Sequence, residues 1–472
     1  MLLLAAAAAL RVLAALAISP GIWFSDSNSY IRAAATGELP TARVAAYGLF
    51  VAPFWHLGSA LALITFQHVL GLGMVVVLYA LLLRRGVGRG LALAAVVPAA
   101  LDAYLVVLEH TVMAETTYHA AVLGGIALLL WQDEPGWAAA LGAGLLLGYA
   151  GAARSVGIPL AAVVLVYLLV RRLGVRRIAA FAAGWALVAG AYVVVFHAQH
   201  GEYAFTTSGG RFLYARVAPF ADCDKVGMPA RLRRLCPDAG PELRTNSYLW
   251  GPRSPIADLP PDDPRPGEFA RRIIRGQPLD YTRVVVRGTL HYFEPGHRIA
   301  YHDYPVAAWQ FPADPRRWSY PGYRGPIRPA APRRGRDAVG VEPNRHVAHF
   351  AGEPSLDVGA SKALHHYQRV AYTWGPLLAA CLLLVAVALV ARRGTWRLRA
   401  DAALLAALTL VALAVPQALS QFSYRYGLIA ALLLPPAAAL AATALRAGGP
   451  AQPPDASNSA AADRPVRTAP SM

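Results

Sequence analysis

Asp26 lies in residues 25–30 (SDSNSY), directly after the first apolar stretch of the chain. A carboxyl group beside a bilayer is costly to desolvate, so an acid in this place is usually kept for a function. A carboxylate can accept a proton from a hydroxyl group that attacks a substrate. Asp26 is therefore the candidate for a catalytic general base.

Other acids, arginines and polar rings also stand where apolar stretches begin or end. They are Arg43, Tyr47, Glu109, Glu115, His119, Arg154 and Arg425. A guanidinium group can hold a phosphate through two parallel hydrogen bonds, and a carboxylate can hold sugar hydroxyls. Together these residues predict a site for a charged lipid substrate.

Each of these residues also has a structural interpretation. Arg154 and Arg425 could extend to lipid head groups, and Arg43 could be an ordinary loop charge. Glu115 and His119 stand four residues apart and could form a buried pair on one helical face. Glu109 could face water in a turn, as could its neighbour His110.

The composition is that of a membrane protein, since 56% of the residues are hydrophobic and 15% are charged. Stretches long enough to cross a bilayer predict about ten transmembrane helices in an all-α polytopic fold. They are residues 2–24, 62–83, 90–110, 113–131, 137–153, 156–170, 178–197, 370–391, 400–420 and 426–445. Residues 44–59 are apolar but contain Pro53 and His56, which predicts a re-entrant or interfacial helix.

Arginine clusters between the apolar stretches predict the orientation, because short cytoplasmic loops are rich in Arg and Lys. The clusters are Arg84, Arg85 and Arg89; Arg171, Arg172, Arg176 and Arg177; Arg392, Arg393, Arg397 and Arg399; and Arg446. Ten spans with both termini in the cytoplasm place every cluster on the inner side. We therefore expect a multi-pass plasma-membrane protein. Many of the arginines behind the net charge of +17 lie in these short loops, and no basic helix interleaved with aromatic residues indicates nucleic-acid binding.

This topology divides the chain into four parts. Residues 1–197 form a transmembrane module with seven spans and a first outer loop at 25–61. Residues 198–366 form a long, proline-rich extracytoplasmic region, of which 267–275 and 278–293 are expected to be helical and the rest irregular. Residues 367–446 supply the last three spans. Residues 447–472 have no apolar period and are expected to be a disordered cytoplasmic tail.

Cys223 and Cys236 share the long region. They can form a disulfide if the region is extracytoplasmic, and would be two free thiols in a reducing compartment.

The order of the candidate residues resembles that of the GT-C membrane glycosyltransferases. This polyprenyl-phosphate-sugar-dependent class includes protein O-mannosyltransferases and lipid A aminoarabinose transferases. Five stretches carry the resemblance: residues 25–30 with Asp26, Arg43 with residues 46–50 (AYGLF), residues 108–116 (LEHTVMAET), residues 147–157 (LGYAGAARSVG), and residues 424–426 (YRY) before Pro435 and Pro436. The first motif has one acid where some family members have an adjacent Asp-Glu pair.

The resemblance implies a GT-C-like fold and a hexosyl- or pentosyltransferase that inverts the anomeric carbon. The donor would be a polyprenyl-phosphate-linked sugar, and the acceptor a cell-envelope glycan, lipid or protein with a free hydroxyl. Asp26 would be the catalytic base. The substrate-binding residues would be Arg43, Tyr47, Glu109, Glu115, His119, Arg154 and Arg425. The sequence predicts no metal ligand set, although the resemblance leaves open a divalent cation.

Two other classes of protein fit parts of the pattern. A transporter or flippase of lipid-linked sugars would also have many spans with polar groups near one face, but the halves show no inverted repeat. A non-catalytic membrane scaffold would leave the acids and arginines on one side unexplained.

Overall fold

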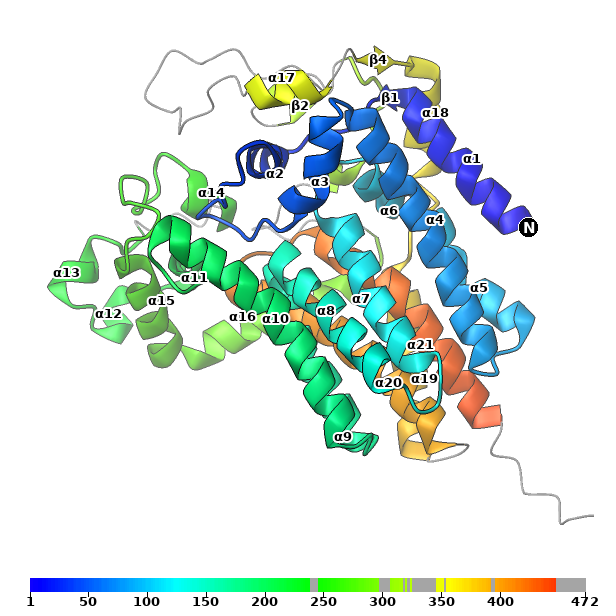
Figure 1. Ribbon diagram of the computed structural model, residues 1–472. Helices are drawn as coiled ribbons and strands as arrows, with labels where there is room; N and C mark the ends of the chain where they lie inside the picture. The colour runs from blue at the N-terminus through cyan, green and yellow to red at the C-terminus, as the bar shows by residue number, and fades with distance from the viewer. Residues whose placement is uncertain are drawn as a thin grey trace, which may run out of the picture.

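The computed structural model describes residues 1–237, 245–296, 306–316, 319–320, 323–324, 345–351, 354–391 and 395–446. The predicted tail at 447–472 lies outside these residues, as do Arg392 and Arg393. Long helices form one bundle, and a smaller group of short helices lies against its side (Figure 1). The protein is thus an all-α membrane protein, with only two-residue strands among the residues described.

Four segments are long and apolar enough to cross a membrane on their own. They are α4 (Ala60–Arg84), α10 (Val175–His200), α20 (Trp396–Leu419) and the combined η5 (Tyr424–Gly427) and α21 (Leu428–Arg446). A fifth candidate is the pair α5 (Arg89–Leu101) and α6 (Ala103–Glu109), bent by 53° at its break. Asp102 occupies the break, and its side chain caps α6 by accepting hydrogen bonds from the backbone N–H groups of Tyr104 and Leu105.

The other predicted spans fall on shorter helices. They are α1 (Leu2–Ala17), α7 (Glu115–Leu130), α8 (Trp137–Ala153), η1 (Ser155–Gly157) with α9 (Leu160–Val170), and α19 (Gly375–Ala391). Each predicted span thus meets a helix, but only four or five of the described segments reach the spanning length. The first span is shorter than predicted: α1 ends at Ala17, so Asp26 lies on a separate helix, α2 (Ser25–Thr36).

An ionic group marks one end of the bundle, and we call it the Asp401 hub: Asp401, Arg85, Arg171 and Asp133. The side chains of the first three are at most 6% exposed, whereas that of Asp133 is 61% exposed. Asp401 is fully buried, and its Oδ1 lies 2.9 Å from Nη1 of Arg171. Arg85 pairs with both Asp401 and Asp133, which follows the C-terminus of α7. Several predicted cytoplasmic arginine clusters therefore meet at the same end of the bundle.

Close packing of α8 on α10 depends on glycine. A Cβ atom on Gly144 would overlap the carbonyl oxygen of Phe181, and one on Gly184 would overlap that of Leu141. The G-x-x-x-G spacing of Gly144 and Gly148 thus serves helix contact. This contact fixes α8, whose C-cap is Arg154.

The long region after α10 contains more helix than predicted. Its elements are α11 (Gly209–Val217), η2 (Ala218–Phe220), α12 (Cys223–Val226), α13 (Ala230–Arg233), α14 (Thr245–Trp250), α15 (Arg265–Gly276), α16 (Pro278–Leu290), η3 (His291–Phe293), η4 (Val306–Trp309), α17 (Arg345–Ala351) and α18 (Val358–Tyr367). The two helices expected there correspond to α15 and α16, but the expectation of irregular structure elsewhere is wrong where the described residues form short helices. Short helices were missed because each is too short to show a hydrophobic period.

A second core holds part of this region together. Tyr214, Leu232, Phe269 and Ile273 are fully buried in it. Cys223 and Cys236 are joined by a disulfide at its edge, with Cα atoms 6.2 Å apart.

Two strand pairs complete the described part of the fold. β1 (Ile18–Ser19) pairs antiparallel with β4 (Ser355–Leu356), and β2 (Ser319–Tyr320) with β3 (Tyr323–Arg324). The first pair ties the exit of α1 to the entrance of α18.

Candidate active site

Asp26 lies in the first turn of α2, and the start of this helix is anchored to the turn between α6 and α7. The backbone N–H of Phe24 donates to Ser27 Oγ at 2.9 Å. Ser27 Oγ in turn donates to the carbonyl of Val112 at 2.8 Å. A bridge between Ile22 and Thr111 reinforces the contact. Asp26 is thereby held beside α7, although the two segments are far apart in sequence.

Five charged side chains meet there, and we call them the Asp26 cluster: Asp26, Arg43, Glu115, Arg154 and Arg425. Asp26 pairs with Arg43 and with Arg425, whose Nη2 lies 3.4 Å from Oδ2. Glu115 pairs with Arg154 and with Arg425, whose Nη1 lies 3.3 Å from Oε1. Arg425 therefore bridges the two carboxylates.

Each member of the cluster comes from a different element. Arg43 precedes α3 (Tyr47–His56), in a loop held by a bond from the N–H of Ala46 to the carbonyl of Ala152 at 3.1 Å. Glu115 is the first residue of α7, Arg154 is the C-cap of α8, and Arg425 lies in η5 between α20 and α21. The helix ends converge here because the chain turns back between successive helices at this level of the bundle.

The cluster and the Asp401 hub occupy opposite ends of the bundle. α7 begins with Glu115 and leads to Asp133 of the hub. α20 carries Asp401 near its start, and Arg425 follows its end. Two helices that run between them therefore separate the cluster from the hub.

Aromatic rings enclose Arg425. Its Cζ lies 4.5 Å from the centroid of the Trp309 ring and 5.1 Å from those of Phe24 and Tyr426. Arg154 lies 5.2 Å from the Tyr426 ring. Such rings exclude water and stabilise the cations through their π faces.

Burial and charge act in opposite directions on Asp26. Burial alone would raise the pKa of Asp26, but the positive charges of Arg43 and Arg425 outweigh burial and lower the pKa to about 2. Burial and the nearby Asp26 charge raise the pKa of the Tyr30 hydroxyl above its usual range. At neutral pH the site therefore presents an ionised Asp26 next to a neutral phenol.

The cluster has an excess of positive charge. Three guanidinium groups face two carboxylates, which leaves one net positive charge. Within the described part of the chain, the buried Nε of Arg43 and of Arg425 and the hydroxyl of Tyr118 have no hydrogen-bond partner. Buried donors are normally paired. An anion with several oxygens would satisfy both the charge and the donors.

Two of the predicted binding residues stand near the cluster without pairing with it. Tyr47 donates its hydroxyl to Gln67 Oε1 at 2.5 Å, and its ring lies 5.0 Å from that of Tyr30. His119 is buried one turn after Glu115, with its ring 5.4 Å from that of Tyr118. Glu115 pairs with Arg154 and Arg425, and not with His119 as in the alternative of a buried Glu115–His119 pair.

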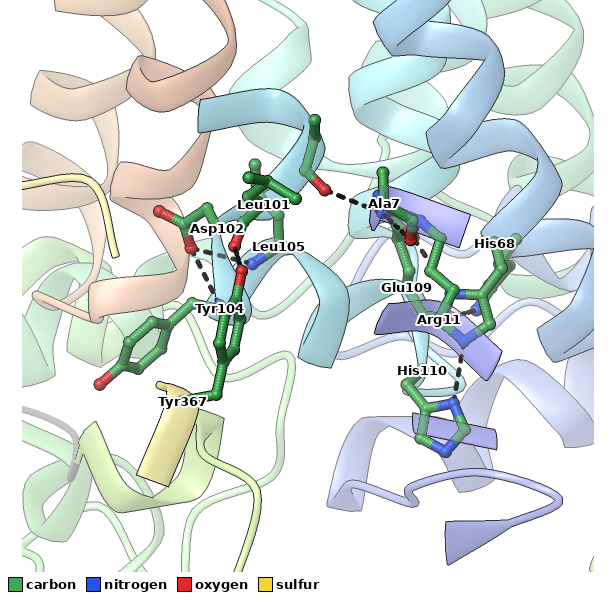
Figure 2. Close-up of polar contacts among 12 residues, drawn as sticks. Ala7, Arg11, His68, Leu101, Asp102, Tyr104, Leu105, Glu109, His110 and Tyr367 are labelled. Carbon is green, nitrogen blue, oxygen red and sulfur yellow. Dashed lines mark hydrogen bonds and ion pairs between the residues drawn. The ribbon is translucent and has the colours of Figure 1, made fainter. Parts of the chain in front are cut away.

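Glu109 lies in a different group from Asp26. It is 3% exposed and pairs with Arg11 of α1, while His110 is fully buried. The interpretation that these two residues face water was wrong, because the turn that carries them is covered by α1 and α4. Figure 2 shows the side chains around Glu109.

Three aromatic residues also lie around the cluster, and their places in the sequence indicate this to different degrees. Tyr426 belongs to the motif at residues 424–426, next to Arg425. Tyr30 is the last residue of the stretch 25–30 that contains Asp26. Trp309 reaches Arg425 from the long region, where no motif or hydrophobic period pointed to it.

The described residues contain no group of three or more His, Cys, Asp or Glu side chains that could hold a metal ion. The donor set of the cluster is instead rich in guanidinium groups, which suit anions.

No protein-family model matches the chain, and neither does any curated protein. Two crystal structures of ArnT from Cupriavidus metallidurans are similar to it. The apo structure is 15% identical, with a TM-score of 0.35 over 94% of this chain and 77% of ArnT. The structure bound to undecaprenyl phosphate is also 15% identical, with a TM-score of 0.36 over 93% of this chain and 77% of ArnT. At this identity and TM-score the likeness does not show what this chain does, so its function is inferred from the side chains of the Asp26 cluster.

Proposed function

We propose that the protein is an integral membrane glycosyltransferase. It would move a sugar from a polyprenyl-phosphate donor to an acceptor hydroxyl at the outer face of the membrane, with inversion at the anomeric carbon. The observation that carries the proposal is the Asp26 cluster: a net positive site with unpartnered buried donors, next to a carboxylate, at one end of an apolar bundle. The sequence motifs of the first outer loop support the same class of donor.

The donor phosphate would bind between Arg43 and Arg425. Both have a buried Nε without a partner in the part of the chain that the structure describes, so a phosphate oxygen could accept from each. Arg154 would add a third positive charge. The isoprenoid tail would leave the site along the apolar helices. The negative charge that develops on the phosphate as it departs would be stabilised by groups already in place.

Asp26 would act as the base. The acceptor oxygen attacks the anomeric carbon from the side opposite the phosphate, the bond between that carbon and the phosphate oxygen breaks, and the electron pair leaves with the phosphate. The proton of the acceptor hydroxyl passes to Asp26.

A carboxylate with a pKa of about 2 is a weak base, and donor binding would correct this. The phosphate would share the charges of Arg43 and Arg425, which are what holds the pKa of Asp26 low. Asp26 would then accept a proton more readily with donor bound than without it. This mechanism couples base strength to the presence of substrate.

Glu115 would hold hydroxyls of the sugar or the acceptor while it stays paired with Arg154 and Arg425. The neutral phenol of Tyr30 could donate a hydrogen bond in the same place. The Asp401 hub supports the orientation, because its arginines would lie on the cytoplasmic side and so put the Asp26 cluster outside.

The test is reconstitution of the full chain in proteoliposomes with radiolabelled polyprenyl-phosphate sugars and a cell-envelope acceptor extract. We expect sugar transfer that is lost in an Arg43→Gln, Arg425→Gln double variant and retained in an Arg32→Gln variant. Arg32 is the matched control, because it lies in the same outer segment and its ion pair with Glu38 is exposed. Movement of intact donor across the bilayer without transfer would refute the transferase and favour a flippase.

A further inference from the structure

A third ionic group, distinct from the Asp401 hub and the Asp26 cluster, is buried between α1, α4 and α6 (Figure 2). Arg11 of α1 holds both oxygens of Glu109, with Nε 2.7 Å from Oε2 and Nη2 2.6 Å from Oε1. Its Nη1 donates to the carbonyls of Ala7 and Ala100 at 3.1 and 3.0 Å. Arg11 is thus fixed by four hydrogen bonds and is only 3% exposed.

Two histidines extend this group in a line. Nδ1 of His68 lies 3.1 Å from Oε2 of Glu109, and Nε2 of His68 lies 3.0 Å from Nδ1 of His110. Nε2 of His110 lies 2.7 Å from the carbonyl oxygen of Ile18. We call Glu109, His68 and His110 the Glu109 triad. Its three contacts run from a carboxylate, through two rings, to a backbone carbonyl.

The contacts fix the number of protons. A carbonyl oxygen only accepts, so Nε2 of His110 carries a proton. Nδ1 of His110 and Nε2 of His68 face each other and need one proton between them. Oε2 of Glu109 and Nδ1 of His68 need another. The line therefore holds three protons.

Two neutral imidazoles and an ionised carboxylate carry only two such protons. The triad therefore holds one extra proton, placed either as an imidazolium beside a carboxylate or as a carboxylic acid beside neutral rings. Moving the proton on Nδ1 of His68 to Oε2 of Glu109 changes the first form into the second.

We propose that this extra proton fixes the segment that leads to Asp26. His110 holds Ile18 through its ring and Ile22 through its carbonyl, to which the N–H of Ile22 donates at 2.8 Å. Asp26 follows four residues later. Loss of the proton breaks the contact between the two rings and releases the His110 side chain from its fixed orientation. This positioning role rests on the proposed function, whereas the proton count does not.

Few other charges reach the triad. Arg11 faces it from α1, and Tyr367 of α18 interacts electrostatically with Arg11. α4 adds the neutral Gln67, which donates to the carbonyl of Glu109 at 2.8 Å, and the ring of Phe311 lies 6.2 Å from that of His110. The strand β1 contributes its backbone only.

The extra proton makes folding depend on pH. In the unfolded chain both histidines are neutral above their ordinary pKa of about 6.5. The folded triad binds one proton more, so its stability falls as pH rises. The unfolding equilibrium constant should increase about tenfold for each pH unit while the triad stays loaded.

The proton count can be tested in the unmutated full chain. Solid-state NMR on nitrogen-labelled histidine in proteoliposomes reports which ring nitrogens carry protons. The signals of His68 can be assigned through its distance to the labelled carboxyl carbon of Glu109. At about pH 8, above the ordinary histidine pKa, we expect a proton on all three contacts of the triad. A bare pair of facing nitrogens between His68 and His110 would overturn the proposal.

The pH dependence can be tested by equilibrium unfolding. Above the ordinary histidine pKa of about 6.5, and for as long as the folded triad keeps its proton, the unfolding constant of the wild type should rise about tenfold per pH unit more than that of His68→Gln, which cannot take up the proton. His56→Gln is the control, because His56 is an exposed histidine at the end of α3. Equal slopes in wild type and His68→Gln would refute the extra proton.

The positioning role needs a separate measurement. Transfer activity of the wild type should fall at alkaline pH as the proton leaves, and His68→Gln should be slower at all pH values without that alkaline fall. An identical alkaline fall in both proteins would refute positioning by the triad. Absence of transfer in the wild type would refute the proposed function and leave the NMR result standing.

Discussion

Replacing Asp26 by asparagine keeps the size of the side chain and removes its charge. The change takes away the proposed base and also one of the two carboxylates that offset Arg43, Arg154 and Arg425. The Asp26 cluster would go from one net positive charge to two. Catalysis and stability should therefore both change, in amounts that can be estimated separately.

The effect on stability follows from the pKa of Asp26. Its lowering from 3.8 to about 2 corresponds to about 2 kcal/mol of favourable interaction when the group is ionised. Because the pKa is lowered, this stabilisation is complete above about pH 4 and disappears as pH falls through about 2. Asp26→Asn should thus lower the free energy of unfolding by about 2 kcal/mol at neutral pH and by little in strong acid.

The effect on catalysis is larger. Loss of a general base should lower kcat by about 100- to 10,000-fold. The KM for the donor should not rise, because the phosphate meets the same arginines with one competing carboxylate fewer. The expected result is a fall in kcat alone.

The assay is initial-rate transfer from a radiolabelled donor in proteoliposomes at several donor concentrations, with unfolding followed on the same preparations. Glu38→Gln is the matched control, since Glu38 is an exposed acid that follows the helix carrying Asp26. Wild-type kcat in Asp26→Asn would remove Asp26 as the base. A raised donor KM with unchanged kcat would mean that Asp26 binds the substrate instead.

Three further substitutions test other parts of the structure. Arg425→Lys keeps the charge but cannot bridge Asp26 and Glu115, so kcat/KM should fall about 10- to 100-fold; an unchanged value in the transfer assay would contradict the bridging role. Gly71→Ala would place a Cβ against Glu109 Oε1 and should cost about 1–3 kcal/mol in an unfolding titration, whereas Gly73→Ala meets open space in the same helix and should be neutral or slightly stabilising. Cys223→Ser breaks the disulfide and should destabilise the second core by about 3 kcal/mol, seen as faster proteolysis of that region; proteolysis at the wild-type rate would argue against it.

Much of the Asp26 cluster could be expected from the sequence. Asp26, Glu115 and Arg154 each stand where an apolar stretch begins or ends, and a helix that crosses a bundle brings its ends to one of two levels. Polar side chains at the same level then pair with one another, because the apolar helices around them offer few other hydrogen-bond or charge partners. Arg43 and Arg425 were found by the same reasoning.

Pairing within the bundle could not be predicted in the same way. Glu109 also stands at a helix end, but it turns inward because Arg11 enters from α1 at the same depth. Arg11 lies inside the first apolar stretch, and a single sequence does not say which other helix faces it. Trp309 was missed because long-range packing of irregular segments leaves no local period. Helix lengths were overestimated because apolar composition continues past Ala17 into β1.

Asp102 has a consequence for the order in which the protein is assembled. Its Oδ1 caps α6, and its Oδ2 accepts from the backbone N–H and the hydroxyl of Thr373 at 2.7 and 2.6 Å. Thr373 lies 271 residues later, so at typical synthesis rates it leaves the ribosome roughly 15 to 50 seconds after Asp102. During that interval the first helices carry a polar group that lacks half of its final partners. The early bundle must therefore stay open to water or to the insertion machinery at this break, and it closes when α19 arrives.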